Sequence, residues 1–102
     1  MDIIHATNES FNKIINMPSA IIDFWAPWCG PCRMLAPILE EINSERSDII
    51  IAKVNVDDYP ELASKYSITS IPAILHFKNG QLIAQTLGYM DKTTLLNKLN
   101  VK

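Results

Sequence analysis

The chain has 102 residues, of which 48% are apolar and 20% charged, and its net charge is −2 at neutral pH. This length predicts one domain, residues 1–102, that can bury a core without cross-links. The slightly acidic balance, with no basic run, argues against nucleic acid or an anionic membrane as the main partner. No apolar stretch reaches the roughly 18 residues of a membrane span.

The first half of the chain predicts a helix, a buried strand and a second helix, after a start with strand character. Thr7 or Asn8 can cap a helix over residues 9–16. Residues 20–26 are almost continuously apolar, which is typical of a central strand covered on both faces. A longer helix is expected after Cys29, because apolar residues recur at spacings of three and four: Met34, Leu35, Ile38, Leu39 and Ile42.

The next segment predicts a strand followed by a short helix. Residues 49–56 return to strand character. Asp58 is expected to cap a helix that ends near Tyr66, with Pro60 early in it and Glu61 at the spacing of a capping box.

The last segment predicts a hairpin and a final helix. Two apolar runs, 72–77 and 82–87, flank Asn79-Gly80, which is the strongest short-range signal for a β-hairpin. Asp91 can cap a helix that follows. Because strands alternate with helices and a hairpin comes last, we expect an α/β fold with a mixed central sheet and helices on both faces.

Both cysteines of the chain lie in the stretch Trp28-Cys29-Gly30-Pro31-Cys32. A separation of three places two side chains on one face of a helical turn, with Cβ atoms roughly 5–6 Å apart. This spacing is close to the one that a disulfide accepts. The pair therefore predicts a site that switches between dithiol and disulfide.

A zinc site is the alternative for the same two cysteines. Tetrahedral zinc needs three or four protein ligands. The chain offers only two histidines to complete such a set, His5 and His76, and we interpret both as ordinary strand residues. We therefore expect no metal.

Asp23 interrupts the apolar run that precedes the cysteines. Burial among isoleucine and aromatic side chains should raise the pKa of this carboxyl group. Two interpretations remain open from the residues alone. Asp23 can exchange a proton with Cys32, or it can be a core aspartate whose hydrogen bonds are satisfied.

The chain resembles the thioredoxin family over essentially its whole length. C-x-x-C alone is a weak pattern, but W-C-G-P-C followed at a distance by Ile-Pro and Lys-Asn-Gly is specific. The resemblance is carried by residues 23–34, 36–39, 52–57, 70–72, 77–80 and Gly88. It implies a thioredoxin fold, with a central mixed five-stranded sheet flanked by about four helices, and the activity of a general protein disulfide reductase.

The resemblance also implies a role for each catalytic residue. Cys29 is expected at the start of a helix, where unpaired N–H groups and the helix dipole lower the pKa of a thiol from about 8.5 toward neutrality. Its thiolate attacks a client disulfide, and Cys32 then resolves the mixed disulfide. Asp23 is expected to exchange a proton with Cys32, and Lys53 to be the charge partner of Asp23.

A substrate-binding surface around the cysteines is implied as well. Ile71 is expected to precede a cis peptide bond and to offer its backbone to an extended client segment. Trp28 should cover the site and contact the client, although packing in the core is an alternative for this side chain. Two residues depart from the usual family pattern, Ser70 and Ala73. The expected surface comprises Trp28, Gly30, Pro31, Val56, Ser70, Ile71, Pro72, Gly88 and Tyr89.

Partners and compartment follow from the same resemblance. The chain has no glycine-rich nucleotide motif, so electrons are expected indirectly from NADPH through a thioredoxin reductase, with no bound cofactor. We expect a monomer that acts on many disulfide-containing clients in electron transport and redox homeostasis. The first residues lack the features of a signal peptide, and two cysteines are too few for a secreted disulfide framework, so we expect the cytoplasm. A processed organellar protein would look the same.

Two other functions stay open. The same residues at a higher reduction potential would make a disulfide oxidase or isomerase, because every 30 mV corresponds to about 1.4 kcal/mol. The fold can also serve as a binding subunit whose role does not depend on redox state.

Overall fold

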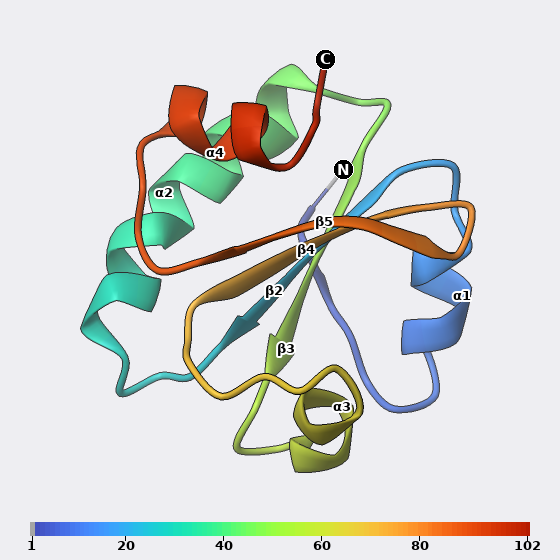
Figure 1. The fold of residues 1–102 in the computed structure, drawn as a ribbon, viewed down its shortest axis with the longest axis vertical. Helices are drawn as coiled ribbons and strands as arrows, with labels where there is room; N and C mark the ends of the chain where they lie inside the picture. Colours follow the sequence, from blue (N-terminus) through green and yellow to red (C-terminus); the bar gives the residue numbers. More distant parts are fainter. Residues whose placement is uncertain (1) are drawn as a thin grey trace.

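Five strands form one mixed sheet in the computed structural model, which describes residues 2–102 (Figure 1). The strands lie in the order β1-β3-β2-β4-β5; β1 and β2 run parallel to β3, whereas β4 is antiparallel to β2 and to β5. This arrangement confirms the predicted α/β fold. The elements in chain order are β1 (Ile4–His5), α1 (Phe11–Ile15), β2 (Ala20–Trp25), α2 (Gly30–Glu45), β3 (Ile50–Asn55), α3 (Pro60–Lys65), β4 (Ala73–Lys78), β5 (Gln81–Leu87) and α4 (Lys92–Lys98).

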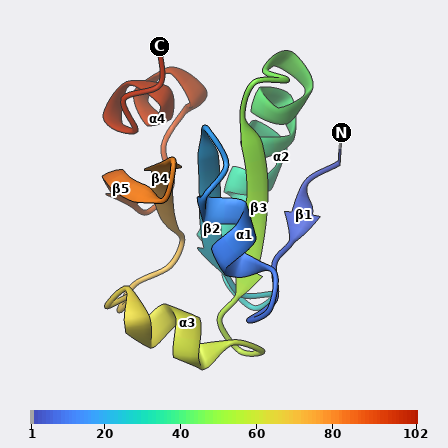
Figure 2. The same cartoon turned by 90° about the vertical axis from the view of Figure 1, so that its right-hand side faces the viewer.

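Helices cover both faces of the sheet, α1 and α3 on one side and α2 and α4 on the other (Figures 1 and 2). Successive side chains of a strand point to opposite faces. Ile22 and Phe24 of β2 therefore pack with Phe11 of α1, while Ile21 packs with Leu35 of α2. The central strand is buried on both sides, as its continuous apolar sequence predicts.

The first helix is shorter than predicted. Thr7 Oγ1 accepts a hydrogen bond from the Ser10 N–H at 3.1 Å, and Ser10 Oγ accepts from the Thr7 N–H at 2.9 Å. This reciprocal pair has the geometry of a capping box, so Thr7 does cap the turn that leads into α1. The regular helix begins only at Phe11, because residues 8–10 form that turn.

The predicted cap of the third helix is wrong. Tyr59, not Asp58, is the residue at the N-cap of α3, and it makes no side-chain cap hydrogen bond. Asp58 instead belongs to a turn in which its N–H donates to the carbonyl of Asn55 at 3.1 Å. Pro60 starts the helix without an N–H that needs a partner, and Glu61 accepts from the Asn8 side chain at 3.3 Å.

The second helix buries a narrower face than its apolar pattern predicts. Leu35, Leu39 and Ile42 are fully buried, and Ile38 is partly buried, but the Met34 side chain is 60% exposed. Each residue advances a helix by 100°, so Met34 lies at the edge of the apolar stripe. Met34 therefore belongs to the apolar pattern that predicts α2 but not to the buried face of the helix.

The hairpin and the final helix are confirmed. Lys78 pairs with Gln81, so Asn79-Gly80 is a two-residue loop, and both loop residues have positive φ angles, 51° and 87°. That combination is the type I′ turn favoured by Asn-Gly. Asp91 accepts a hydrogen bond from the Thr94 N–H at 2.8 Å and so caps α4. Among the helices of residues 2–102, none combines the length and apolar character needed to span a bilayer.

Replacing Gly80 by alanine should destabilise the protein by about 1–3 kcal/mol. A side chain at a positive φ costs roughly 1–2 kcal/mol. A Cβ at Gly80 would also collide with Asn16 Oδ1, so the side chain that donates to the Asn12 carbonyl at 2.7 Å must move. Urea unfolding of the oxidised protein measures the loss.

Gly88 provides the matched control, because its φ is also positive but a Cβ added there would meet nothing within 4 Å. Gly88→Ala should therefore cost less than Gly80→Ala. In an Asn16→Ala background the two costs should become equal. Equal costs in the unmodified background would show that the collision contributes nothing.

Candidate active site

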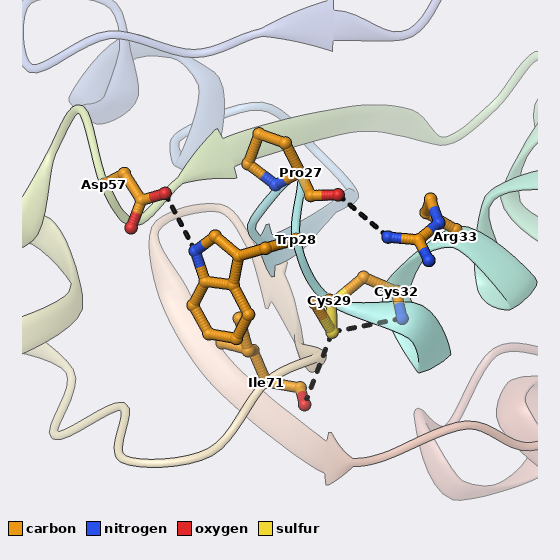
Figure 3. The surroundings of a disulfide bond; sticks show 7 residues. All are labelled: Pro27, Trp28, Cys29, Cys32, Arg33, Asp57 and Ile71. Carbon is orange, nitrogen blue, oxygen red and sulfur yellow. Dashed lines mark hydrogen bonds between the residues drawn. A yellow bond between two sulfur atoms is a disulfide. The ribbon is translucent and has the colours of Figure 1, made fainter.

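The two cysteines form a disulfide at the start of α2 (Figure 3). Cys29 is the N-cap residue of α2 and Cys32 lies in its first turn, with their Cα atoms 5.3 Å apart. The N–H of Cys32 points at Cys29 Sγ, 3.2 Å away. The predicted spacing of a redox pair is confirmed. Cys29 is 5% exposed and Cys32 is 2% exposed. Only a molecule in close contact with this surface can therefore reach either sulfur.

The position of Cys29 favours negative charge on its sulfur. The first N–H groups of a helix have no partner within the helix, and the helix dipole adds positive potential at that end. When the disulfide is reduced, this environment stabilises the thiolate, which is the form that attacks disulfides.

Histidines do not complete a metal site with the cysteines. Within residues 2–102, no group of three or more His, Cys, Asp or Glu side chains is placed to hold a metal ion. His76 is buried and both of its ring nitrogens face other partners, Ser19 and Leu99. His5 lies in β1 and His76 in β4, so both histidines are strand residues as predicted.

Asp23 is fully buried in β2, and neither carboxylate oxygen has a hydrogen-bond partner in the described chain. The described protein atoms therefore do not supply the hydrogen bonds that the interpretation of a satisfied core aspartate requires. Desolvation raises the pKa of Asp23 to about 7, although the positive charge of Lys53 acts in the opposite direction. The group consequently gains or loses its proton near neutral pH.

Lys53 is the cross-strand neighbour of Asp23, since the two residues pair in the register between β3 and β2. Its ammonium group lies 4.3 Å from the centre of the Trp25 ring, a cation–π arrangement. Trp25 packs against the two cysteines, and its buried Nε1 has no acceptor in the described chain.

Lys53→Gln should raise the pKa of Asp23 above about 7, because it removes the charge that opposes desolvation. NMR titration of the Asp23 carboxyl carbon measures this change. Lys65→Gln is the matched control, because Lys65 also lies over an aromatic ring, that of Tyr66, but carries no interaction with Asp23. An unchanged titration in Lys53→Gln would show that the charge of Lys53 does not affect the pKa of Asp23.

Trp28 stands at the surface beside the disulfide, with 67% of its area exposed. The alternative of core packing is therefore wrong for this residue. Its indole Nε1 donates to Asp57 at 3.0 Å, while Arg33 donates to the carbonyl of Pro27 at 2.9 Å (Figure 3). The loop before Cys29 is thus tied on one side to the segment after β3 and on the other side to α2.

The Ile71–Pro72 peptide bond is cis, as the resemblance implies. The carbonyl oxygen of Ile71 lies 3.9 Å from Cys29 Sγ (Figure 3). The carbonyl of Pro72 accepts a hydrogen bond from the Gly88 N–H at 2.8 Å, which brings the end of β5 beside this segment. The segment that contains Ile71 therefore faces Cys29, and Gly88 at the end of β5 lies beside that segment.

The other expected surface residues are distributed as follows. Gly30 and Pro31 lie between the cysteines in the first turn of α2, and Val56 packs with Ile71 against the cysteine pair. Ser70 and Tyr89 are exposed, whereas Pro72 is buried.

Three residues of this region were not expected from the sequence. Asp57 accepts the hydrogen bond from the Trp28 indole, although 29 positions separate the two residues. Met34 and Leu87 are 60% and 55% exposed, and with Trp28 and Tyr89 they make up four of the five large exposed apolar side chains in the described chain. Met34 follows Gly30 by four positions, which places both on one helix face; this spacing is the signal that could have identified it.

Comparison with known proteins gives consistent matches. The Thioredoxin family model matches residues 2–101. The chain is 42% identical over 101 residues to the thioredoxin of Bacillus subtilis (strain 168), covering 98% of this chain and 97% of the relative. It is 51% identical over 81 residues to thioredoxin 1 of Synechococcus elongatus, covering 78% and 76%.

A solved structure agrees with these sequences. A mutant thioredoxin from Halobacterium salinarum NRC-1 matches with a TM-score of 0.86 and 28% identity, covering 96% of this chain and 87% of that one. The five-stranded sheet, the disulfide at the start of α2 and these matches together show that the chain belongs to the thioredoxin family of protein disulfide oxidoreductases.

Proposed function

We propose that this chain, as one domain, reduces disulfides of many client proteins and is recharged by a thioredoxin reductase that draws electrons from NADPH. The observation that carries the proposal is the Cys29–Cys32 disulfide at the N-terminus of α2. A disulfide in that position becomes a stabilised thiolate on reduction. Because the reductase holds the nucleotide, the chain itself needs no bound cofactor.

The reaction proceeds by two exchanges of sulfur bonds. The Cys29 thiolate attacks one sulfur of the client disulfide, and the other client sulfur leaves as a thiolate. The Cys32 thiol loses its proton and attacks Cys29 Sγ, which breaks the mixed disulfide. The client then leaves as a dithiol, and two electrons have passed from the cysteine pair to the client.

Asp23 is proposed to take the proton of Cys32 in the second exchange, directly or through water. Its support is burial together with a pKa raised to about 7, which lets the group accept a proton at neutral pH. Lys53 is proposed as the charge that prevents this pKa from rising further.

Clients are proposed to bind across the apolar surface that surrounds the disulfide. The carbonyl of Ile71, close to Cys29, can accept a backbone hydrogen bond from an extended client segment. Apolar contact without charged anchors suits weak binding to many partners. The proposed surface is Trp28, Gly30, Pro31, Val56, Ser70, Ile71, Pro72, Gly88 and Tyr89.

We also propose that the chain works as a monomer in the cytoplasm, in electron transport and redox homeostasis. The small number of cysteines and their use as a redox pair support a reducing compartment. Size-exclusion chromatography of the reduced chain tests the oligomeric state.

Reduction of insulin by dithiothreitol tests the activity. The chain should accelerate this reduction at micromolar concentration, and a rate equal to that of dithiothreitol alone would contradict the proposal. Family membership does not favour a disulfide oxidase. Equilibration with glutathione separates the two, because a pair that millimolar glutathione largely reduces would be an oxidant.

A further inference from the structure

A second chain of hydrogen bonds lies at the opposite end of β2 from the disulfide. Ser19 Oγ is 2.9 Å from Nε2 of His76, and Nδ1 of His76 is 2.7 Å from the carbonyl oxygen of Leu99. Ser19 directly precedes β2, whereas Cys29 lies after the end of β2, directly before α2. The length of the strand, roughly 20 Å, separates the two places.

The partners of His76 fix the direction of these hydrogen bonds. A carbonyl oxygen only accepts, so Nδ1 carries the hydrogen that it donates to Leu99. In the neutral ring, Nε2 then presents its lone pair to Ser19, and the hydroxyl group is the donor. The result is a hydroxyl bonded to a base whose ring is oriented by a third group, the order of groups that activates serine nucleophiles.

An activated serine needs a base that is shielded from water and a hydroxyl group that a substrate can reach. His76 is 1% exposed, which shields its ring from water, whereas Ser19 is half-buried. Both residues line a cavity of about 390 Å³. That volume falls within the range of small-molecule sites.

Three cationic side chains and one carboxylate line the cavity: Lys78, Lys102 and Arg46, with Asp48 paired to Arg46 at 2.8 Å. This excess of cationic over anionic side chains in the cavity favours the negative oxygen that develops when a serine attacks a carbonyl group.

We propose that Ser19 is a second nucleophile, activated by His76, that accepts the acyl group of a small activated ester. Ser19 Oγ forms a bond to the carbonyl carbon while its proton moves to Nε2. The alcohol oxygen of the ester leaves with its bonding electron pair and takes that proton. The product is an ester of Ser19, and no oxidant or reductant takes part, so the reaction is independent of the disulfide.

p-Nitrophenyl acetate tests the proposal on the oxidised protein, in which the described chain has no free cysteine to compete. Peptide mapping by mass spectrometry should find acetyl on Ser19 at least about a hundredfold faster than on Ser44, the lower limit of what a positioned base contributes. Ser44 is the matched control, because its hydroxyl is exposed and donates to the Glu41 carbonyl at 2.9 Å. Equal rates on the two serines, or acetyl on lysines alone, would overturn the proposal.

Variants separate activation from mere accessibility. Ser19→Ala should abolish the adduct, and His76→Gln, which keeps the hydroxyl group, should slow its formation by about a hundredfold or more. An unchanged rate in His76→Gln would overturn the role of the imidazole. Insulin reduction by the same preparation reports whether each variant is folded. If His76→Gln does not fold, the comparison of Ser19 with Ser44 in the unmodified protein decides.

Discussion

Cys29→Ser should lower the rate of insulin reduction by roughly three orders of magnitude or more, to that of dithiothreitol alone. A serine hydroxyl at the start of α2 is not ionised at neutral pH and forms no disulfide. Cys32→Ser should behave differently, because the nucleophile remains and only the second exchange is lost. We expect a mixed disulfide between Cys29 and the client to accumulate.

Intact-protein mass spectrometry of the Cys32→Ser variant with a disulfide client detects that adduct. Ser44→Ala provides a control that changes an exposed serine far along α2 from the disulfide and should leave the rate unchanged. If the adduct instead formed on Cys32 in the Cys29→Ser variant, the order of the two exchanges would be the reverse of the one proposed.

The buried carboxyl group predicts the second large effect, a loss of stability of the oxidised protein as pH rises. Asp23 has a pKa of about 7 in the folded state and 3.8 as its ordinary value. Between these two values the unfolded chain releases the proton while the folded chain keeps it, so the free energy of unfolding falls with pH. Above pH 7 both states are ionised and the loss levels off, at about 4 kcal/mol in total.

Urea unfolding of the unmodified chain and of Asp23→Asn, at intervals from pH 4 to 8.5, measures this effect. The amide cannot ionise, so the stability of Asp23→Asn relative to the unmodified chain should increase with pH and become constant above about pH 7. Asp58→Asn, at an exposed position, should show no such trend. A stability difference for Asp23→Asn that does not vary with pH would mean that the carboxyl group titrates normally.

The two predictions are linked through function. A carboxylate that costs stability at neutral pH is retained at the strand that leads into the cysteines. Asp23→Asn should therefore be more stable at pH 8 and slower in the second exchange. Stability and the proposed proton transfer place opposite demands on the same side chain.

Most features that depend on neighbouring residues in the sequence were predicted well, the cap of α3 being the exception. Asn79-Gly80 specifies its turn through the φ angles that these residues tolerate, and Asp91 caps a helix three residues away. The continuous apolar run of β2 identifies a strand buried on both faces. The cysteine pair was predictable for the same reason, because its two residues are only three positions apart in the sequence.

Features that depend on distant segments were not predictable in this way. Trp28 has an apolar ring that suits either the core or the surface, and its bond to Asp57 exists only because β2 and β3 lie side by side. His76 lies within hydrogen-bond distance of Ser19 and Leu99, which are 57 and 23 positions away in the sequence. The cis bond at Pro72 was expected from the family resemblance alone, because an Ile-Pro pair by itself favours trans.

The alkylation of the reduced protein by iodoacetamide at pH 7 tests the central claim most directly. If the start of α2 holds Cys29 as a thiolate, the reagent should modify Cys29 at least about ten times faster than Cys32, since only the thiolate reacts. Peptide mapping after short exposure gives the two rates in one sample. Equal rates, or faster modification of Cys32, would contradict the account.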